Sequence, residues 1–191
     1  TYAEPDDQRA FQAYERVLDT NPDDPTALNN LAIALPPTAA ARSIELLERA
    51  VEGPGATFVA HQNLILGYWN TGRPDEASAM AERLIARFPD NPVAYDRQAD
   101  LLTMQGRFRE AHDARLAASE VGEMSAGRRA FMGMQLASED FALGRLAEAR
   151  EHIGEAVRIA EASGQPSWAV DALTGWAYGL SGLGLRTDSI E

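Results

Sequence analysis

The three histidines are the side chains best suited to acid–base or metal chemistry, and their spacing favours neither. His61, His112 and His152 are widely separated along the chain, with spacings of 112 − 61 = 51 and 152 − 112 = 40. None has a second histidine four residues away, as the zinc motif HExxH requires. Glu148 does precede His152 by four residues, but one such pair is typical of a surface contact. The histidines therefore predict no metal site.

Other residue types exclude further chemistry. The chain has no cysteine, so disulfide, thiolate–zinc and cysteine-nucleophile chemistry are excluded. All 17 basic residues are arginine, which removes the lysine of a P-loop or a Schiff base. The serines lack the context of a nucleophile elbow, and Gly182-Leu183-Gly184 is too short for a phosphate loop. We therefore expect no enzymatic activity and no cofactor.

Charge limits the partners. With 29 acidic side chains the net charge is −12, which is poorly suited to nucleic acid or to anionic membrane surfaces. No apolar run approaches the roughly 18 residues of a membrane span, so direct membrane insertion is not expected. The expected location is cytoplasmic, or extracytoplasmic if a parent protein is membrane-anchored. Because residue 1 is threonine, we expect a fragment of a longer chain.

An internal repeat dominates the sequence. The segment Gly72-Arg73-Pro74-Asp75-Glu76-Ala77 is echoed by Gly106-Arg107-Phe108-Arg109-Glu110-Ala111, at a spacing of 106 − 72 = 34. A third copy begins at Gly144, where the spacing is 144 − 106 = 38, and the difference indicates one inserted helical turn. One residue is missing from an earlier period of the repeat. We place this deletion in the tight connection at Pro36-Pro37. Periods of about 20–50 residues indicate stacked structural units.

The repeat resembles the tetratricopeptide repeat (TPR), in which each unit is a pair of antiparallel helices. Ala77, Ala81, Leu84 and Pro89 fit its second helix, whereas the next copy places Arg115 between Ala111 and Ala118. The resemblance implies an all-α, right-handed TPR solenoid. It would have about five repeats with incomplete first and last units, in one domain over residues 1–191. Helices are expected at 6–20, 25–35, 40–52, 57–71, 74–88, 92–105, 108–121, 127–142, 146–163 and 167–182.

The resemblance also implies a binding face, because first helices of TPR units line a concave surface that holds peptides or partner helices. The side chains expected there are Asn29, Asn30, Gln62, Asn63, Trp69, Asn70, Asp96, Arg97, Asp100, Met134 and Phe141. Asn30 and Asn63 occupy matching places, where an amide both donates to and accepts from a peptide backbone. The alternative is that both are solvated polar positions or local caps.

Other members of this face have alternative interpretations. Asp96 and Asp100 share a helix face and suit a basic ligand, or form a solvated acidic face paired with Arg97 and Arg107. The aromatic–methionine group is either contact surface or core, and core is the usual outcome at helical spacing; its members are Phe131, Met132, Met134 and Phe141. Trp69 is either a partner-contact residue or a core residue. His61 is expected to pack against a neighbouring helix.

The sequence thus predicts a scaffold that binds a protein or peptide segment. One alternative is self-assembly, with homodimers formed through terminal helices near Trp168 and Trp176. Another is a peptide-sensing regulatory domain attached to a catalytic domain outside this chain. Asn29-Asn30-Leu31-Ala32 and Gly106-Arg107-Phe108 are also similar to TPR regions of bacterial multidomain regulators such as serine/threonine protein kinases.

Overall fold

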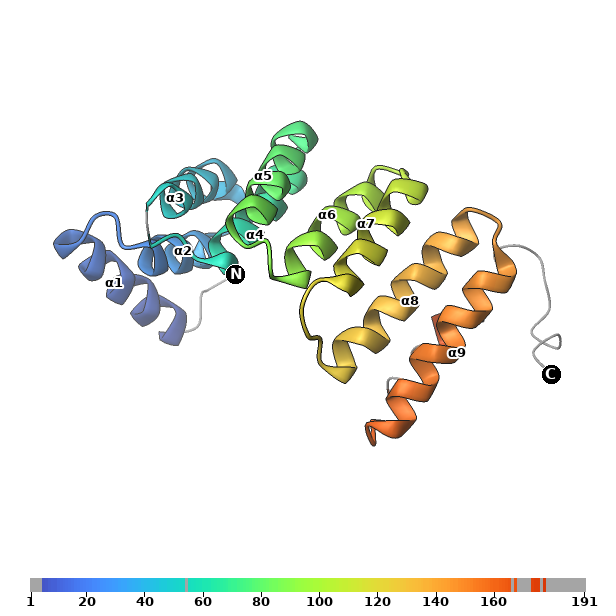
Figure 1. Cartoon of the computed structure of the whole chain (residues 1–191). Coiled ribbons are helices and arrows are strands. Elements are labelled where there is room, and N and C mark those ends of the chain that lie inside the picture. Colours follow the sequence, from blue (N-terminus) through green and yellow to red (C-terminus); the bar gives the residue numbers. More distant parts are fainter. Residues whose placement is uncertain (1–4, 54, 166, 168–172, 176, 178–191) are drawn as a thin grey trace. The chain divides into compact units, whose positions relative to one another are not determined.

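The computed structural model describes residues 5–53, 55–165, 167, 173–175 and 177 (Figure 1). All regular structure among these residues is helical. The elements are α1 (Pro5–Thr20), α2 (Pro25–Ala34), the 3₁₀ turn η1 (Pro37–Ala39), α3 (Ala40–Glu52), α4 (Phe58–Asn70), α5 (Pro74–Arg87), α6 (Pro92–Met104), α7 (Phe108–Glu120), α8 (Ala126–Ala142) and α9 (Leu146–Ala162). No described helix combines the length and apolar character needed to cross a membrane.

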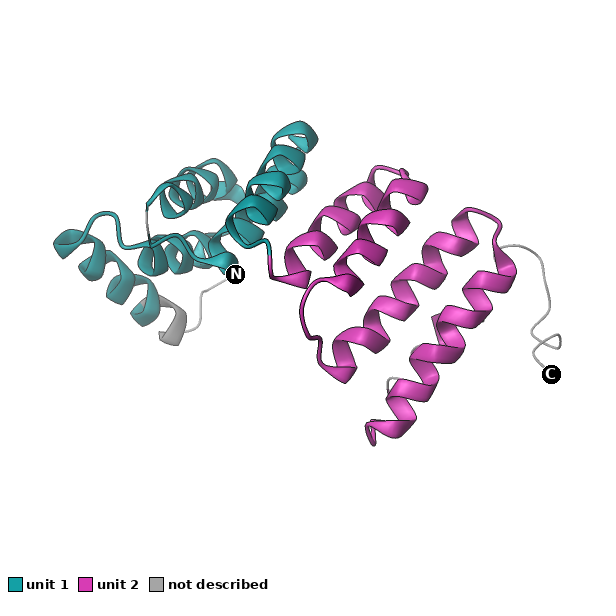
Figure 2. Cartoon of the chain, in the orientation of Figure 1, with its two compact units in different colours: residues 1–89 teal, residues 90–191 magenta. Residues whose placement is uncertain are grey.

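The helices form two compact units, residues 1–89 (unit 1) and residues 90–191 (unit 2) (Figure 2). In unit 1 each helix from α1 to α5 packs on the next, and α2 also contacts α4. In unit 2 each helix from α6 to α9 packs on the next. Within each unit, successive helices are therefore neighbours in space, as a helical repeat requires. The assignment of residues 1–191 to a single domain stays a prediction.

Local signals place the helix ends. The Asp24 carboxylate accepts a hydrogen bond from the Ala27 backbone N–H at 2.8 Å, and Asn91 caps α6 in the same way through Val93. A proline follows each cap at the first helical position. Just after the C-terminal end of α4, Gly72 has a φ of 73°, a backbone conformation that favours glycine. This turn lets the Arg73 N–H bond back to the Tyr68 carbonyl at 2.9 Å.

The core is built on small residues at repeated positions. Ala77, Ala81 and Leu84 of α5 are fully buried, as are Ala111 and Ala118 of α7. Side chains of this size let neighbouring helices approach closely. The approach is very close at Gly133 of α8, where an added Cβ would lie 3.1 Å from the His152 carbonyl oxygen. The close approach of helices in the core thus depends on short side chains at these positions.

The helix expectations are confirmed to within one residue at each described end. The predicted inserted turn is present, since α8 has 17 residues where α6 has 13. The tenth predicted helix, at 167–182, lies largely outside the described residues. Trp168, Trp176 and the proposed terminal pairing surface fall there too.

Candidate functional site

The predicted binding residues of unit 1 lie on α2 and α4, two first helices that contact each other. The buried Asn29 accepts a hydrogen bond from the Asn63 amide nitrogen at 2.8 Å and donates one to the Asn30 amide oxygen at 3.0 Å. We call these three residues the amide ladder. It joins two repeats and leaves Asn30 and Asn63 half-buried.

Apolar side chains lie beside the amide ladder at the same repeat position. Ile33, one turn after Asn30, is 57% exposed, and Leu66, one turn after Asn63, is 52% exposed. Their spacing, 66 − 33 = 33, equals that of Asn30 and Asn63, so they are equivalent positions of successive units. An apolar side chain open to water at two equivalent places is suited to contact with a partner. Trp69 and Gln62 are half-buried on α4, and Asn70 is exposed.

In unit 2 the predicted acidic residues face inward. Asp96 is fully buried and accepts from the guanidinium groups of Arg115 and Arg128. Asp100 accepts from Arg115 at 3.1 Å and pairs with Arg97 at 2.9 Å. The prediction of a solvated acidic face is therefore wrong for Asp96. Asp96 also presents no exposed surface to a ligand.

The predicted pairing with Arg107 is also wrong, because that side chain pairs with Glu110 within its own helix turn. The paired Arg97 is half-buried. The α6 carboxylates of Asp96 and Asp100 instead pair with the buried Arg115 in the interior of unit 2.

The centre of this arrangement is Arg115, a fully buried guanidinium on α7. It donates to Glu139 of α8 at 3.0 Å as well as to both aspartates of α6. We call Arg115, Asp96, Asp100 and Glu139 the arginine cluster. Burial raises the pKa of Glu139, and the charge of Arg115 opposes that rise. The signal in the sequence was Arg115 itself, a charge at a repeat position that is otherwise small or apolar.

The methionine–aromatic group of α8 mostly joins the core. Met132 is buried, and half-buried Met134 and Phe141 pack on a cluster that includes Ala149 and Ile153. Phe131 differs, being 41% exposed. The core interpretation therefore fits three of the four side chains.

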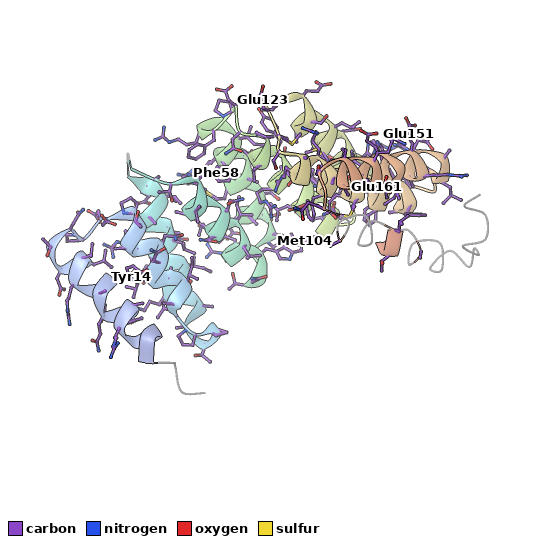
Figure 3. All side chains as sticks on the ribbon, turned by 90° about the horizontal axis from the view of Figure 1, so that it is seen from below. Tyr14, Phe58, Met104, Glu123, Glu151 and Glu161 are labelled. Atoms are coloured by element: carbon purple, nitrogen blue, oxygen red, sulfur yellow. The ribbon has the colours of Figure 1, made fainter. Side chains whose placement is uncertain are left out.

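His61 packs as the sequence predicts. Its ring is buried, its Nδ1 lies 2.8 Å from the Thr57 carbonyl oxygen, and it meets the Phe88 ring edge-on at 5.7 Å between centroids. Phe58, labelled in Figure 3, also meets the Phe88 ring edge-on, at 5.3 Å between centroids. Burial lowers the pKa of His61, which keeps the ring neutral near pH 7.

The other two histidines are not isolated, contrary to the sequence-based expectation. His112 of α7 and His152 of α9 both approach the Asp140 carboxylate of α8. Their spacing, 152 − 112 = 40, exceeds the local repeat spacing of 144 − 106 = 38 by only two, so they lie on successive second helices. A ligand motif within one helix cannot reveal this group, because its three members lie on three helices.

Comparison with known proteins agrees with the repeat. The sequence model of the tetratricopeptide repeat matches residues 58–101. The structure of MamA AMB-1 is 25% identical and has a TM-score of 0.63, covering 82% of this chain and 90% of that one. No curated protein is similar enough in sequence to count as a match.

Two further structures share the fold at lower identity. A second MamA structure has a TM-score of 0.69 at 18% identity, over 86% of this chain and 99% of that one. TTC0263, a thermophilic TPR protein of Thermus thermophilus, has a TM-score of 0.65 at 18% identity, over 87% and 88%. TPR proteins bind proteins or peptides and are generally non-catalytic. The chain thus has an all-α solenoid fold of the TPR type, with a TPR sequence match at residues 58–101, and these findings support a protein–protein interaction or scaffold module.

Proposed function

We propose that the chain binds an extended peptide or protein segment along α2 and α4 of unit 1. The observation that carries this proposal is the pair of exposed apolar side chains, Ile33 and Leu66, beside the amide ladder. Burying two large aliphatic side chains under a partner supplies the hydrophobic part of the affinity.

The amide ladder supplies the polar part. Its two internal hydrogen bonds use the amide oxygen of Asn30 and the amide nitrogen of Asn63. The Asn30 NH₂ group and the Asn63 amide oxygen remain to face a peptide backbone, one as donor and the other as acceptor. Because Asn29 holds both amides, they are oriented before a ligand arrives, which lowers the entropic cost of binding.

The experiment is a peptide-library selection on the whole chain, followed by fluorescence anisotropy with the peptide that binds best. We expect Leu66→Asp to weaken binding by about 30-fold or more, the effect of losing a central contact residue. Asn63→Ala should weaken it by about fivefold, because one net hydrogen bond is lost.

Leu116→Asp is the matched control, since Leu116 is also an exposed leucine (39%) but lies on the second helix α7. It should leave the dissociation constant unchanged. Equal binding by the wild-type, Leu66→Asp and Leu116→Asp chains would contradict the proposed face.

A further inference from the structure

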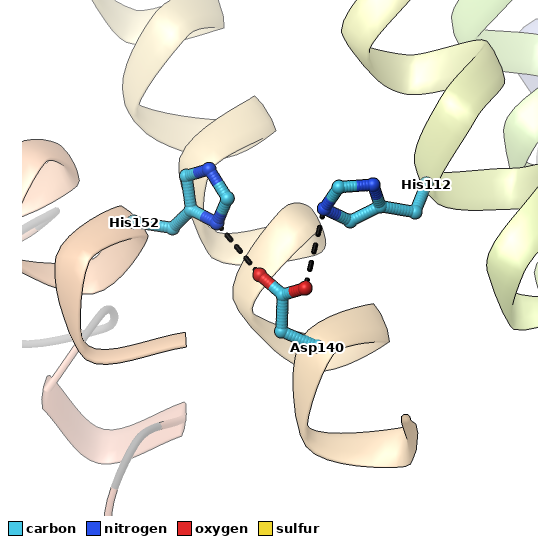
Figure 4. A group of neighbouring side chains, drawn as sticks. All are labelled: His112, Asp140 and His152. Carbon is cyan, nitrogen blue, oxygen red and sulfur yellow. Dashed lines mark hydrogen bonds and ion pairs between the residues drawn. The ribbon is translucent and has the colours of Figure 1, made fainter. Parts of the chain in front are cut away.

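Three side chains from three successive helices converge at one point in unit 2. His112 comes from α7, Asp140 from α8 and His152 from α9 (Figure 4). One nitrogen of each ring and a carboxylate oxygen all lie within 4.8 Å of one another. His112 is 7% exposed and Asp140 is fully buried. We call these residues the histidine–aspartate group.

Hydrogen bonding inside the group is incomplete. His152 Nδ1 lies 2.7 Å from Asp140 Oδ2, which is a hydrogen bond. His112 Nε2 lies 3.2 Å from Asp140 Oδ1, yet both of these buried atoms lack a hydrogen-bond partner. Buried polar atoms in native proteins are almost always satisfied. His112 Nε2 and Asp140 Oδ1 are therefore close together without a hydrogen bond between them. Two ligand atoms of one metal ion have the same arrangement.

We propose that the histidine–aspartate group binds one divalent transition-metal ion of the Zn²⁺ class. Imidazole nitrogen suits Zn²⁺, Co²⁺ and Ni²⁺, whereas Ca²⁺ and Mg²⁺ prefer sets of oxygen ligands. Ligand atoms at the usual Zn²⁺ bond lengths of about 2.0–2.2 Å lie about 3.3 Å apart in a tetrahedron. The 3.2 Å separation of His112 Nε2 and Asp140 Oδ1 is close to that value. His152 Nδ1 lies 2.7 Å from the other carboxylate oxygen, Oδ2, and would move outward when an ion replaces that hydrogen bond. Three protein ligands leave one position for water.

The surroundings suit reversible loading. The His152 side chain is 27% exposed, which gives an ion a route from solvent. The other ring nitrogen of His112, Nδ1, also lacks a hydrogen-bond partner, and Asp113 Oδ1 lies 4.0 Å from it. A carboxylate that closes this gap would orient a metal-bound histidine. Arg145 opposes the ion, because its Nη1 lies 3.8 Å from Asp140 Oδ1. Since that side chain is 35% exposed, it can turn outward when an ion enters.

Loading would join α7 to α8 and α9, and so tie two successive repeats together. An ion that binds the folded chain and not the unfolded one stabilises the fold by mass action. The metal therefore acts here as a clip within unit 2, independently of the peptide face of unit 1.

The test is a titration of the untagged, chelator-treated chain with Co²⁺, followed by visible absorption, and with Zn²⁺, followed by calorimetry. We expect one ion per chain, ligand-field bands of low-symmetry Co²⁺ and a raised melting temperature. Loss of a residue that only orients a metal ligand weakens metal binding by up to about 100-fold. Because His152 would bind the ion directly, we expect His152→Gln to weaken binding by more than that. Because His152 is partly exposed, this variant is expected to fold even if His112→Gln does not.

His61→Gln is the matched control, a buried histidine of unit 1 outside this group. It should bind Co²⁺ as the wild type does, and Arg145→Gln should bind more tightly. Two results would overturn the proposal. One is no Co²⁺ binding by the wild type, which would make the group a hydrogen-bonded cluster only. The other is equal binding by the wild-type and His152→Gln chains.

Discussion

Equivalent positions of the repeat carry opposite chemistry in the two units. Ala81 of unit 1 and Arg115 of unit 2 are one repeat apart (115 − 81 = 34), and both are fully buried. Leu66 and Asp100 have the same spacing (100 − 66 = 34); Leu66 is exposed, whereas Asp100 pairs with Arg115. Unit 1 therefore keeps an uncharged interior and exposed apolar side chains on its first helices. Unit 2 uses the matching positions for its own interior.

The difference shows how a repeat separates binding from packing. An uncharged interior lets the first-helix side chains of unit 1 face a partner. In unit 2 the guanidinium at position 115 needs carboxylates around it, because an unpaired buried charge is very costly. Asp96 and Asp100 of α6 meet that need, and Asp96 is fully buried in doing so. For this reason we propose the peptide face on unit 1 and not on unit 2.

The largest expected effect comes from replacing Arg115 of unit 2 with alanine, the residue that unit 1 has at the equivalent position 81. Arg115→Ala should lower the free energy of unfolding by about 3–5 kcal/mol, because it leaves buried carboxylates without their counterion. Urea denaturation followed by circular dichroism measures the change. Arg158→Ala is the control, since Arg158 forms an exposed pair with Glu155 and should cost under about 1 kcal/mol. Equal losses in the two variants would show that the arginine cluster contributes no more than a surface pair.

Two glycines sharpen the comparison with the same substitution. In unit 2, Gly133→Ala should destabilise by about 1 kcal/mol or more, because the new Cβ meets the His152 carbonyl oxygen at 3.1 Å. In unit 1, Gly67→Ala should stabilise by up to about 1 kcal/mol, because its Cβ meets only the Ile44 and Leu47 side chains at 3.5 Å and 3.8 Å. Thermal unfolding measures both. Changes of the same sign would refute the difference in helix packing.

The last expected effect appears only at alkaline pH. Burial, and then the hydrogen bond to Glu48, raises the pKa of Tyr68 in unit 1 to about 12. A raised folded-state pKa contributes stability that is fully present below the unfolded value of about 10 and is lost as pH rises toward 12. Tyr68→Phe should therefore lose less stability over this alkaline interval than the wild type. Parallel losses in both chains would mean that Tyr68 ionises normally.

The sequence was sufficient for the helices because their signals are local. Asp24-Pro25 and Asn91-Pro92 predict two helix starts, and Gly72 predicts a helix end; each signal acts within a few residues. The inserted turn of α8 followed from the spacing between Gly106 and Gly144 alone. Such features need no knowledge of what lies across the interface.

The side-chain groups could not be predicted in the same way. Asp96 could face solvent or the interior, and only the direction of its side chain relative to Arg115 decides. His112 and His152 meet because Asp140 lies between their helices, which depends on the twist between successive repeats. The exposed Leu66 was predictable, since its place on a first helix follows from the repeat.

The most direct test of the division between the units is amide hydrogen exchange, measured by mass spectrometry with and without a saturating selected peptide. We expect added protection in residues 25–34 and 58–70, which hold Ile33, Leu66 and the amide ladder. Exchange in residues 108–162 should not change. Protection confined to residues 108–162, with none in α2 and α4, would contradict the assignment of binding to unit 1.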